Sequence, residues 1–212
     1  MDTQPLQIDV FADVVCPWCF VGHVRLERVL ADLGCPARVS HHTFMLDPNT
    51  PPEGSDIPAR LRRKYGVPPE QLWARLEAEA RKSGLELDLS RQRWSYPTAR
   101  AHTLLRHAVD KGTQAALVRA LYRAHFEDAR NVNDPDVLAE VAGTHGFTAD
   151  EVARLTSDER ELAETRAEAQ AAAGAGIDGV PFFVFGERLA VAGAQPESVL
   201  RDAIEQAIRG AP

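Results

Sequence analysis

The sequence predicts an α/β fold in which strands lie near both ends of the chain and a long helical segment lies between them. Strand-like runs occur at residues 6–12, 37–44, 182–185 and 189–191, and alternating or short continuous apolar runs are typical of strands. From about residue 58 to residue 175, apolar residues instead recur three and four positions apart, as they do along one face of a helix.

The first ~45 residues are predicted to form a strand–helix–strand unit. Leu6 to Ala12 alternates apolar and polar residues, and Ala37 to Phe44 is predicted as a second strand. Between them, apolar residues at positions 26, 29, 30 and 33 form one face of a helix, which Gly34 and Pro36 end. A crossover of this kind normally joins parallel strands.

The helical segment follows a connection rich in proline and glycine, Pro48 to Ser55. No strand-like alternation interrupts it. Asp134 and Pro135 are typical of a helix start, and a further helix is predicted from a cap at Ser157 or Asp158 to Ala175.

The end of the chain returns to strands. Phe182–Phe185 and Leu189–Val191 flank a short turn that contains Gly186, so they are predicted to form a hairpin. A last helix opens at Pro196, with apolar residues along one face.

The composition is that of a globular protein and excludes several classes. The chain has 212 residues, 44% hydrophobic and 26% charged, close to the average for soluble domains. Its formal net charge of −7 argues against nucleic acid or a membrane surface as the main partner, because both attract basic faces. Three cysteines are too few for a secreted disulfide scaffold. Met1 to Pro5 carry no basic leader, and no apolar run is long enough to span a bilayer. A cytoplasmic location is therefore expected.

The motif that carries chemistry is Cys16-Pro17-Trp18-Cys19. Two cysteines at this spacing, beside a strand–helix–strand unit, are typical of a redox-active dithiol. The unpaired N–H groups at a helix start favour the thiolate of Cys16, while Cys19 lies one turn further along the helix. We expect Cys16 to attack and Cys19 to resolve, with Pro17 and Trp18 setting the redox poise.

Two other interpretations of the cysteine pair remain open. A zinc half-site would need a second pair at ligand spacing. Cys35 and the adjacent His41 and His42 do not supply one, so no metal is predicted. Free cysteines can also be ordinary buried core residues.

Val180-Pro181 opens the predicted hairpin. Proline cannot donate to a sheet ladder. One explanation is a cis peptide bond, which would leave the backbone of Val180 free to pair with an extended substrate. An ordinary trans turn proline is the alternative.

Together these motifs resemble the DsbA-like oxidoreductases of the thioredoxin-fold superfamily. The chain is most similar to their FrnE-like branch, which is related to 2-hydroxychromene-2-carboxylate isomerase and kappa-class glutathione transferase. The resemblance is carried by residues 13–22, 44–48, 64–66, 101–102, 176–184 and 193–196. It implies a thioredoxin-like domain of residues 1–50 and 176–212, with an all-helical domain of residues 51–175 inserted in it.

The resemblance also implies a site. The two motif cysteines would be the redox pair and Pro181 a cis proline. Isomerase and transferase relatives carry a serine that activates glutathione at the first cysteine position, so the two cysteines favour disulfide chemistry. Many relatives have Asn-Thr where this chain has Pro97-Thr98. Thr98 and His102 are candidates for the substrate cleft, while a contact made by the asparagine is in doubt.

The sequence thus predicts a thiol–disulfide oxidoreductase that reduces, oxidises or isomerises disulfides. No cofactor is required, although glutathione could serve as reductant or co-substrate. The expected partner is a disulfide-containing protein or a small thiol, and a homodimer is compatible with the sequence. The alternative is a glutathione-dependent isomerase or transferase acting on a small aromatic or polyketide-like substrate. A third hypothesis is a helical chaperone with a vestigial dithiol.

Four further residues near the motif have open interpretations. Asp13 either tunes the thiol pair or relays a proton, or it has a turn or capping role. Trp18 is expected to be exposed, where it either contacts a substrate peptide or forms a packing edge. His23 is expected on a solvated helix face. His102 is either a cleft residue or a satisfied core histidine.

No role is predicted for the remaining histidine pair or the third cysteine. His41 and His42 are adjacent in a strand and therefore point to opposite faces. Cys35 follows a predicted helix of ~16 residues, which separates it from Cys16 by about 24 Å. That is beyond the reach of a disulfide, so Cys35 is expected to be an ordinary loop cysteine.

Overall fold

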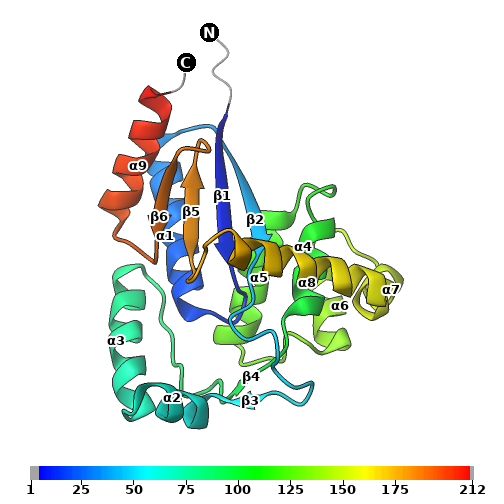
Figure 1. Cartoon of the computed structure of the whole chain (residues 1–212). Helices are drawn as coiled ribbons and strands as arrows, with labels where there is room; N and C mark the ends of the chain where they lie inside the picture. Colours follow the sequence, from blue (N-terminus) through cyan, green and yellow to red (C-terminus); the bar gives the residue numbers. More distant parts are fainter. Residues whose placement is uncertain (1–4, 211–212) are drawn as a thin grey trace.

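The main sheet joins the two ends of the chain. The computed structural model describes residues 5–210 (Figure 1); residues 1–4, in which no leader was expected, and residues 211–212 lie outside the described part. Four strands follow the order β2-β1-β5-β6, namely β1 (Leu6–Ala12), β2 (Ala37–Thr43), β5 (Phe182–Phe185) and β6 (Leu189–Ala192). β1 is parallel to β2 and antiparallel to β5, and β5 and β6 form a hairpin. The predicted strands and the parallel crossover are confirmed.

Helices cover both faces of this sheet (Figure 1). α1 (Pro17–Leu33) and α9 (Glu197–Arg209) pack together on one face, and α8 (Glu159–Gly174) crosses the other. Side chains alternate between the faces along each strand. Phe183 therefore joins the core under α1, whereas Phe11 and Phe182 pack with Ala172 of α8.

The segment between β2 and β5 is mainly helical. Its helices are α2 (Ile57–Tyr65), α3 (Pro69–Lys82), α4 (Ala99–His107), α5 (Gln114–Phe126), α6 (Pro135–Gly143), α7 (Ala149–Ser157) and α8. Asp134 caps α6 and Asp158 caps α8, as two of the predicted starts require.

One expectation for this segment was wrong. Strand β3 (Ser55–Asp56) pairs antiparallel with β4 (Trp94–Ser95), so a strand does interrupt the helices. Each of these strands has two residues, which is too short to show a period in the sequence.

The helical segment also covers the open edge of β2. The Gln114 amide accepts from the His41 N–H and donates to the His41 carbonyl, both at 2.9 Å, as a neighbouring strand would. Further along, the Glu168 carboxylate accepts from the N–H and the hydroxyl of Thr43 at 3.2 and 2.9 Å. Unpaired strand edges invite association with other chains, and these side chains occupy this one.

Acid should weaken the contact between α8 and β2. Burial by itself raises the pKa of Glu168, but hydrogen bonds from His42 and Thr43 outweigh it and hold the pKa at about 2. The unfolded value is about 4.3. Because the pKa of Glu168 is lower in the folded than in the unfolded protein, the ionised carboxylate stabilises the fold at pH values above the unfolded pKa. This stabilisation is lost as the pH falls towards the folded pKa. The relevant window is therefore about pH 4.3 down to 2.

We expect Glu168→Gln to lower stability at neutral pH, and the difference from the native chain to shrink as the pH falls through that window. Denaturant unfolding at a series of pH values measures it. The matched control is Glu164→Gln, because Glu164 lies one turn before Glu168 on α8 and its side chain is exposed. A difference that stays constant down to the acid limit would contradict the prediction.

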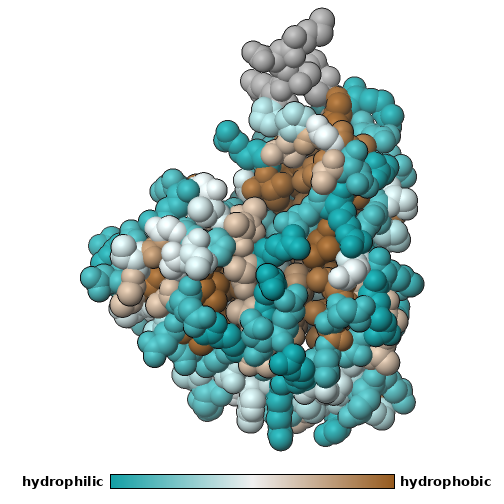
Figure 2. Space-filling model, turned by 180° about the vertical axis from the view of Figure 1, so that it is seen from behind, coloured by the Kyte–Doolittle hydropathy of each residue, from teal (hydrophilic) through white to brown (hydrophobic). Residues whose placement is uncertain are grey.

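The outer surface is mostly polar. Hydrophilic side chains cover much of the face seen in Figure 2, and hydrophobic ones show between them in patches. Within residues 5–210, no helix combines the length and the apolar character needed to cross a bilayer.

Candidate active site

The cysteine motif lies where β1 ends and α1 begins, at the lower end of the sheet in Figure 1. The Cys16 N–H donates to the Asp13 carbonyl at 3.0 Å and closes the connecting turn. Cys16 is the N-cap of α1, with an extended backbone at φ −96° and ψ 112°. Pro17 takes the first helical position, where its missing N–H costs nothing.

The two thiols are free and occupy unequal surroundings. Cys16 is 4% exposed and lies beside the first-turn N–H groups of α1, a turn that contains no acidic residue. Cys19 is 1% exposed. Burial, followed by the hydrogen bond and the charge of Cys16, raises the pKa of the Cys19 thiol well above its ordinary value. Both thiols are thus buried, Cys16 at the start of the helix and Cys19 one turn further in with a raised pKa.

The start of β5 closes over Cys16. The Val180–Pro181 peptide bond is cis, and the Val180 carbonyl oxygen lies 3.9 Å from Cys16 Sγ although the residues are 164 apart in sequence. Gly22 permits the approach of α1, because a Cβ atom there would lie 2.9 Å from Pro181 Cγ and 3.1 Å from Phe183 Cζ.

Asp13 connects this turn to the helical segment. It is 1% exposed. One carboxylate oxygen accepts from the Leu46 N–H at 2.8 Å, and the other lies 3.3 Å from Nε2 of His102 on α4. Asp13 therefore holds the local turn, and it also places a buried carboxylate beside the cysteines.

The two predicted cleft residues lie inside the protein. His102 is 3% exposed and Thr98 is 6% exposed. The backbone N–H of His102 donates a hydrogen bond to the Thr98 carbonyl oxygen at 3.0 Å. The Thr98 hydroxyl makes none of the contacts described above. Both side chains are therefore buried, and for His102 this agrees with its alternative interpretation as a core histidine.

Two expectations about α1 were also wrong. Trp18 is half-buried and packs against the main core instead of standing free. His23 is buried, with Nε2 3.2 Å from Glu27 and its ring centroid 5.3 Å from that of His41. The reason is that the sheet and helices α3, α5 and α9 enclose the middle of α1, so it has no solvated face there.

Tyr122 belongs to the site and was missed. It is 1% exposed on α5. Burial, then the neighbouring charge of Cys19, raises its pKa well above the ordinary value. It directly follows Leu121 and was not part of the predicted apolar stripe of α5, and nothing local to it indicates proximity to a cysteine.

Other chemistry is sparse. Cys35 is a half-buried free thiol between α1 and β2. In the part of the chain from residue 5 to residue 210, no three His, Cys, Asp or Glu side chains gather in a way that could hold a metal ion.

Comparisons with known proteins agree with this architecture. A probable DsbA oxidoreductase from Streptomyces coelicolor is 36% identical, with a TM-score of 0.86 over 98% of this chain and 92% of that chain. A 2-hydroxychromene-2-carboxylate isomerase has a TM-score of 0.72 at 17% identity, over 96% of both chains. The cytosolic disulfide reductase DsbM from Pseudomonas aeruginosa, solved with GSH, has a TM-score of 0.64 at 19% identity, over 96% of this chain and 100% of that chain.

The two more distant likenesses show the shared fold. The family evidence is stronger, because the model of the DSBA-like thioredoxin domain matches residues 7–205, nearly the whole chain. The match includes the cysteine motif, the helical segment and the strand that Pro181 precedes. The chain therefore belongs to the DSBA-like thioredoxin domain family, the disulfide oxidoreductases that its sequence resembles.

Proposed function

We propose that the chain is a thiol–disulfide oxidoreductase whose redox-active dithiol is Cys16 and Cys19. The observation that carries the proposal is the inequality of the two sulfurs. Cys16 lies at the start of a helix with no acidic residue in its first turn, and Cys19 is buried with a raised pKa. A nucleophile must be a thiolate, and a resolving thiol must wait until the mixed disulfide has formed.

The reaction proceeds in two exchanges. The Cys16 thiolate attacks one sulfur of a substrate disulfide, the substrate S–S bond breaks, and one half leaves as a thiolate. Cys19 then loses its proton and attacks Cys16, which releases the second half. The dithiol becomes a disulfide, and the substrate gains two electrons. The reverse sequence oxidises a substrate dithiol.

The surroundings of Cys16 suit an extended substrate. The backbone of Val180 lies beside the reacting sulfur and can pair with a peptide in the manner of strand addition. The half-buried Trp18 forms the neighbouring apolar rim, and Pro17 starts the helix that presents Cys16. The partner is a disulfide-containing protein or a small thiol.

Glutathione is the reductant that we propose for the cell. The likeness to DsbM, described as cytosolic and solved with GSH, supports both this choice and a cytoplasmic location. The low cysteine content is consistent with the same location.

A glutathione-dependent isomerase or transferase is the second candidate. The likeness to 2-hydroxychromene-2-carboxylate isomerase favours it. This second function predicts that isomerase or transferase activity survives the loss of Cys19, because a single side chain is enough to activate glutathione.

Reduction of insulin disulfides by dithiothreitol distinguishes these functions. We expect the native chain to accelerate it, the double variant Cys16→Ser/Cys19→Ser to show only the uncatalysed rate, and Cys35→Ser to match the native chain. Equal activity in the double variant would contradict the proposal and favour a chaperone-like effect. An inactive native chain that binds glutathione tightly would favour the isomerase or transferase.

A further inference from the structure

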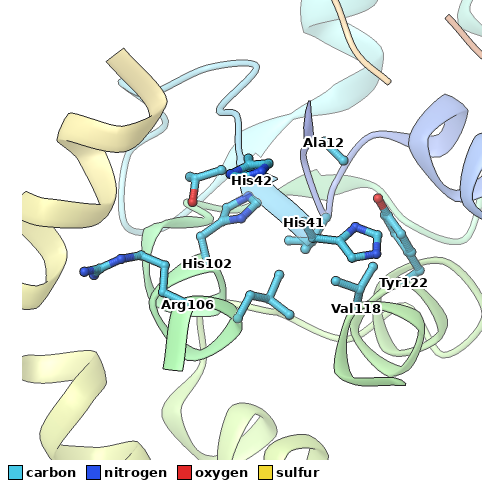
Figure 3. A pocket seen from close by; sticks show the side chains of 10 residues that line it. Ala12, His41, His42, His102, Arg106, Val118 and Tyr122 are labelled. Atoms are coloured by element: carbon cyan, nitrogen blue, oxygen red, sulfur yellow. The ribbon is translucent and has the colours of Figure 1, made fainter. Parts of the chain in front are cut away.

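A small cavity lies between the sheet and helices α4 and α5. It is lined by His41 and Ala12 from the sheet, His102 from α4, and Val118 and Tyr122 from α5. Figure 3 shows the His41 ring turned towards Tyr122, with the His102 ring near His42 on the other side. The volume of about 10 Å³ is close to the least that one water molecule needs.

Polar atoms in the cavity wall need a hydrogen-bond partner, which such a water would provide. Both ring nitrogens of His41 are fully buried and have no hydrogen-bond partner among the described residues. Burial lowers the pKa of His41 well below its ordinary value, so the ring is neutral and carries one donor and one acceptor. Unpaired buried groups of this kind are costly, and one water in the cavity would satisfy a donor or an acceptor.

His102 differs from His41 in having a carboxylate beside it. Its Nε2 lies 3.3 Å from the Asp13 carboxylate, and both side chains are buried. A proton added to His102 makes an imidazolium whose charge is paired at once. His41 instead faces other imidazoles, those of His23, His42 and His102, and is the poorer site for a proton.

The proposed function requires a proton acceptor close to Cys19. Cys19 must lose its proton before it can attack Cys16, yet it is only 1% exposed, so bulk water is a poor acceptor. Tyr122 adjoins both Cys19 and the cavity. Tyr122 and His102 line the same cavity, so one water in it would connect Tyr122, and through it Cys19, with His102.

We propose that His102, held by Asp13, takes the proton of the Cys19 thiol through a water that His41 and Tyr122 hold in this cavity. The inference rests on the proposed function. In the resolving step the Cys19 S–H proton passes to His102, the Cys19 sulfur bonds to Cys16, and the Cys16–substrate bond breaks. The departing substrate thiolate is later protonated from solvent or from His102. Because His102 acts through the water, it is a positioning residue.

Other charged or titratable groups face this cluster and belong to its titration. They come from every neighbouring element, namely Asp9 of β1, Asp13 of the following turn, Cys16, Cys19, His23 and Glu27 of α1, His41 and His42 of β2, Arg106 of α4, Tyr122 and His125 of α5, and Glu168 of α8.

The test separates the two exchanges in time. The reduced chain, in a Cys35→Ser background, is mixed with the chromogenic disulfide dithiobis(nitrobenzoate), and thiol release is followed by stopped flow. The first phase reports attack by Cys16 and the second reports attack by Cys19. We expect His102→Gln to slow the second phase about 10-fold or more at neutral pH, as loss of an acid–base group does, and to leave the first phase unchanged.

Glutamine is chosen because its amide N–H can keep the hydrogen bond that Nε2 makes to Asp13. A merely structural histidine would therefore be rescued, whereas a proton acceptor would not. We also expect the second phase of His102→Gln to accelerate steadily with pH, because hydroxide must then remove the proton, while the native rate depends on pH less steeply. His107→Gln, on the same helix but outside the cavity, is the matched control.

The remaining outcomes are decisive as well. A native second phase in His102→Gln, with the native pH profile, overturns the relay and leaves the dithiol function standing. A native chain that releases a single thiol contradicts the dithiol function and the relay together. If His102→Gln does not fold, Tyr122→Phe replaces it, since it removes only a hydroxyl. A second phase at the native rate in that variant overturns the proposal.

Discussion

Cys16→Ser is expected to abolish disulfide reduction, whereas Cys19→Ser is expected to stop the reaction with half of the substrate attached to Cys16. The reason is the difference between the two sulfurs. Cys16 borders the helix start and the Val180 carbonyl, so it can receive a substrate. Cys19 is buried, and its raised pKa keeps it protonated at neutral pH, so it cannot replace Cys16 as the first nucleophile.

The mass of the intact protein after incubation with oxidised glutathione measures this difference. We expect Cys19→Ser to gain one glutathione per chain and Cys16→Ser to gain none in the motif, with a Cys35→Ser background removing the third thiol. Dithiothreitol should restore the original mass of Cys19→Ser. An adduct that forms more readily on Cys16→Ser than on Cys19→Ser would reverse the roles of the two cysteines.

Gly22→Val is expected to cause the largest loss of stability among single substitutions around the motif. The Cβ atom alone would lie 2.9 Å from Pro181 and 3.1 Å from Phe183, closer than ordinary contact allows, and valine adds two further carbons. Overpacking of a core typically costs ~1–3 kcal/mol. Gly22→Ala should lose less, because the better helix propensity of alanine recovers up to ~1 kcal/mol.

Denaturant unfolding of the reduced protein tests this order. Gly174→Ala is the matched control, since Gly174 is also helical and nothing lies within 4 Å of its added Cβ; we expect it to be neutral or slightly stabilising. The Gly22→Val protein should also reduce insulin more slowly than the native chain. The reason is that α1, which begins directly after Cys16, must move away from Pro181. A Gly22→Val chain as stable as Gly174→Ala would show that α1 and Pro181 separate without cost.

Much of the fold could be predicted because its signals are local. The start of α1 follows from Pro17 after an extended residue, and the β5–β6 hairpin follows from two apolar runs around a turn at Gly186. Asp134 and Asp158 announce the helices that they cap. Each signal lies within about one turn of helix or one strand, so the sequence contains it in full.

The candidate site was only partly predictable for the same reason. Cys16 and Cys19 could be found from their spacing and from the helix that follows. The burial of His23 could not, because the period of α1 shows which residues share a face and not how many neighbours enclose the helix. The short pairing of β3 with β4 was missed because two residues carry no period.

The sequence by itself determined the order of the main-sheet strands around a helical segment, the dithiol at a helix start and the family. Tertiary structure alone decided that Asp13 meets His102 across 89 residues, that Val180 lies beside Cys16 across 164, and that Gly22 faces Pro181. The physical reason is that backbone preference and hydrophobic period act between near neighbours along the chain. Contacts between distant segments depend on how whole helices and strands pack, which is settled only when all of their surfaces are buried together.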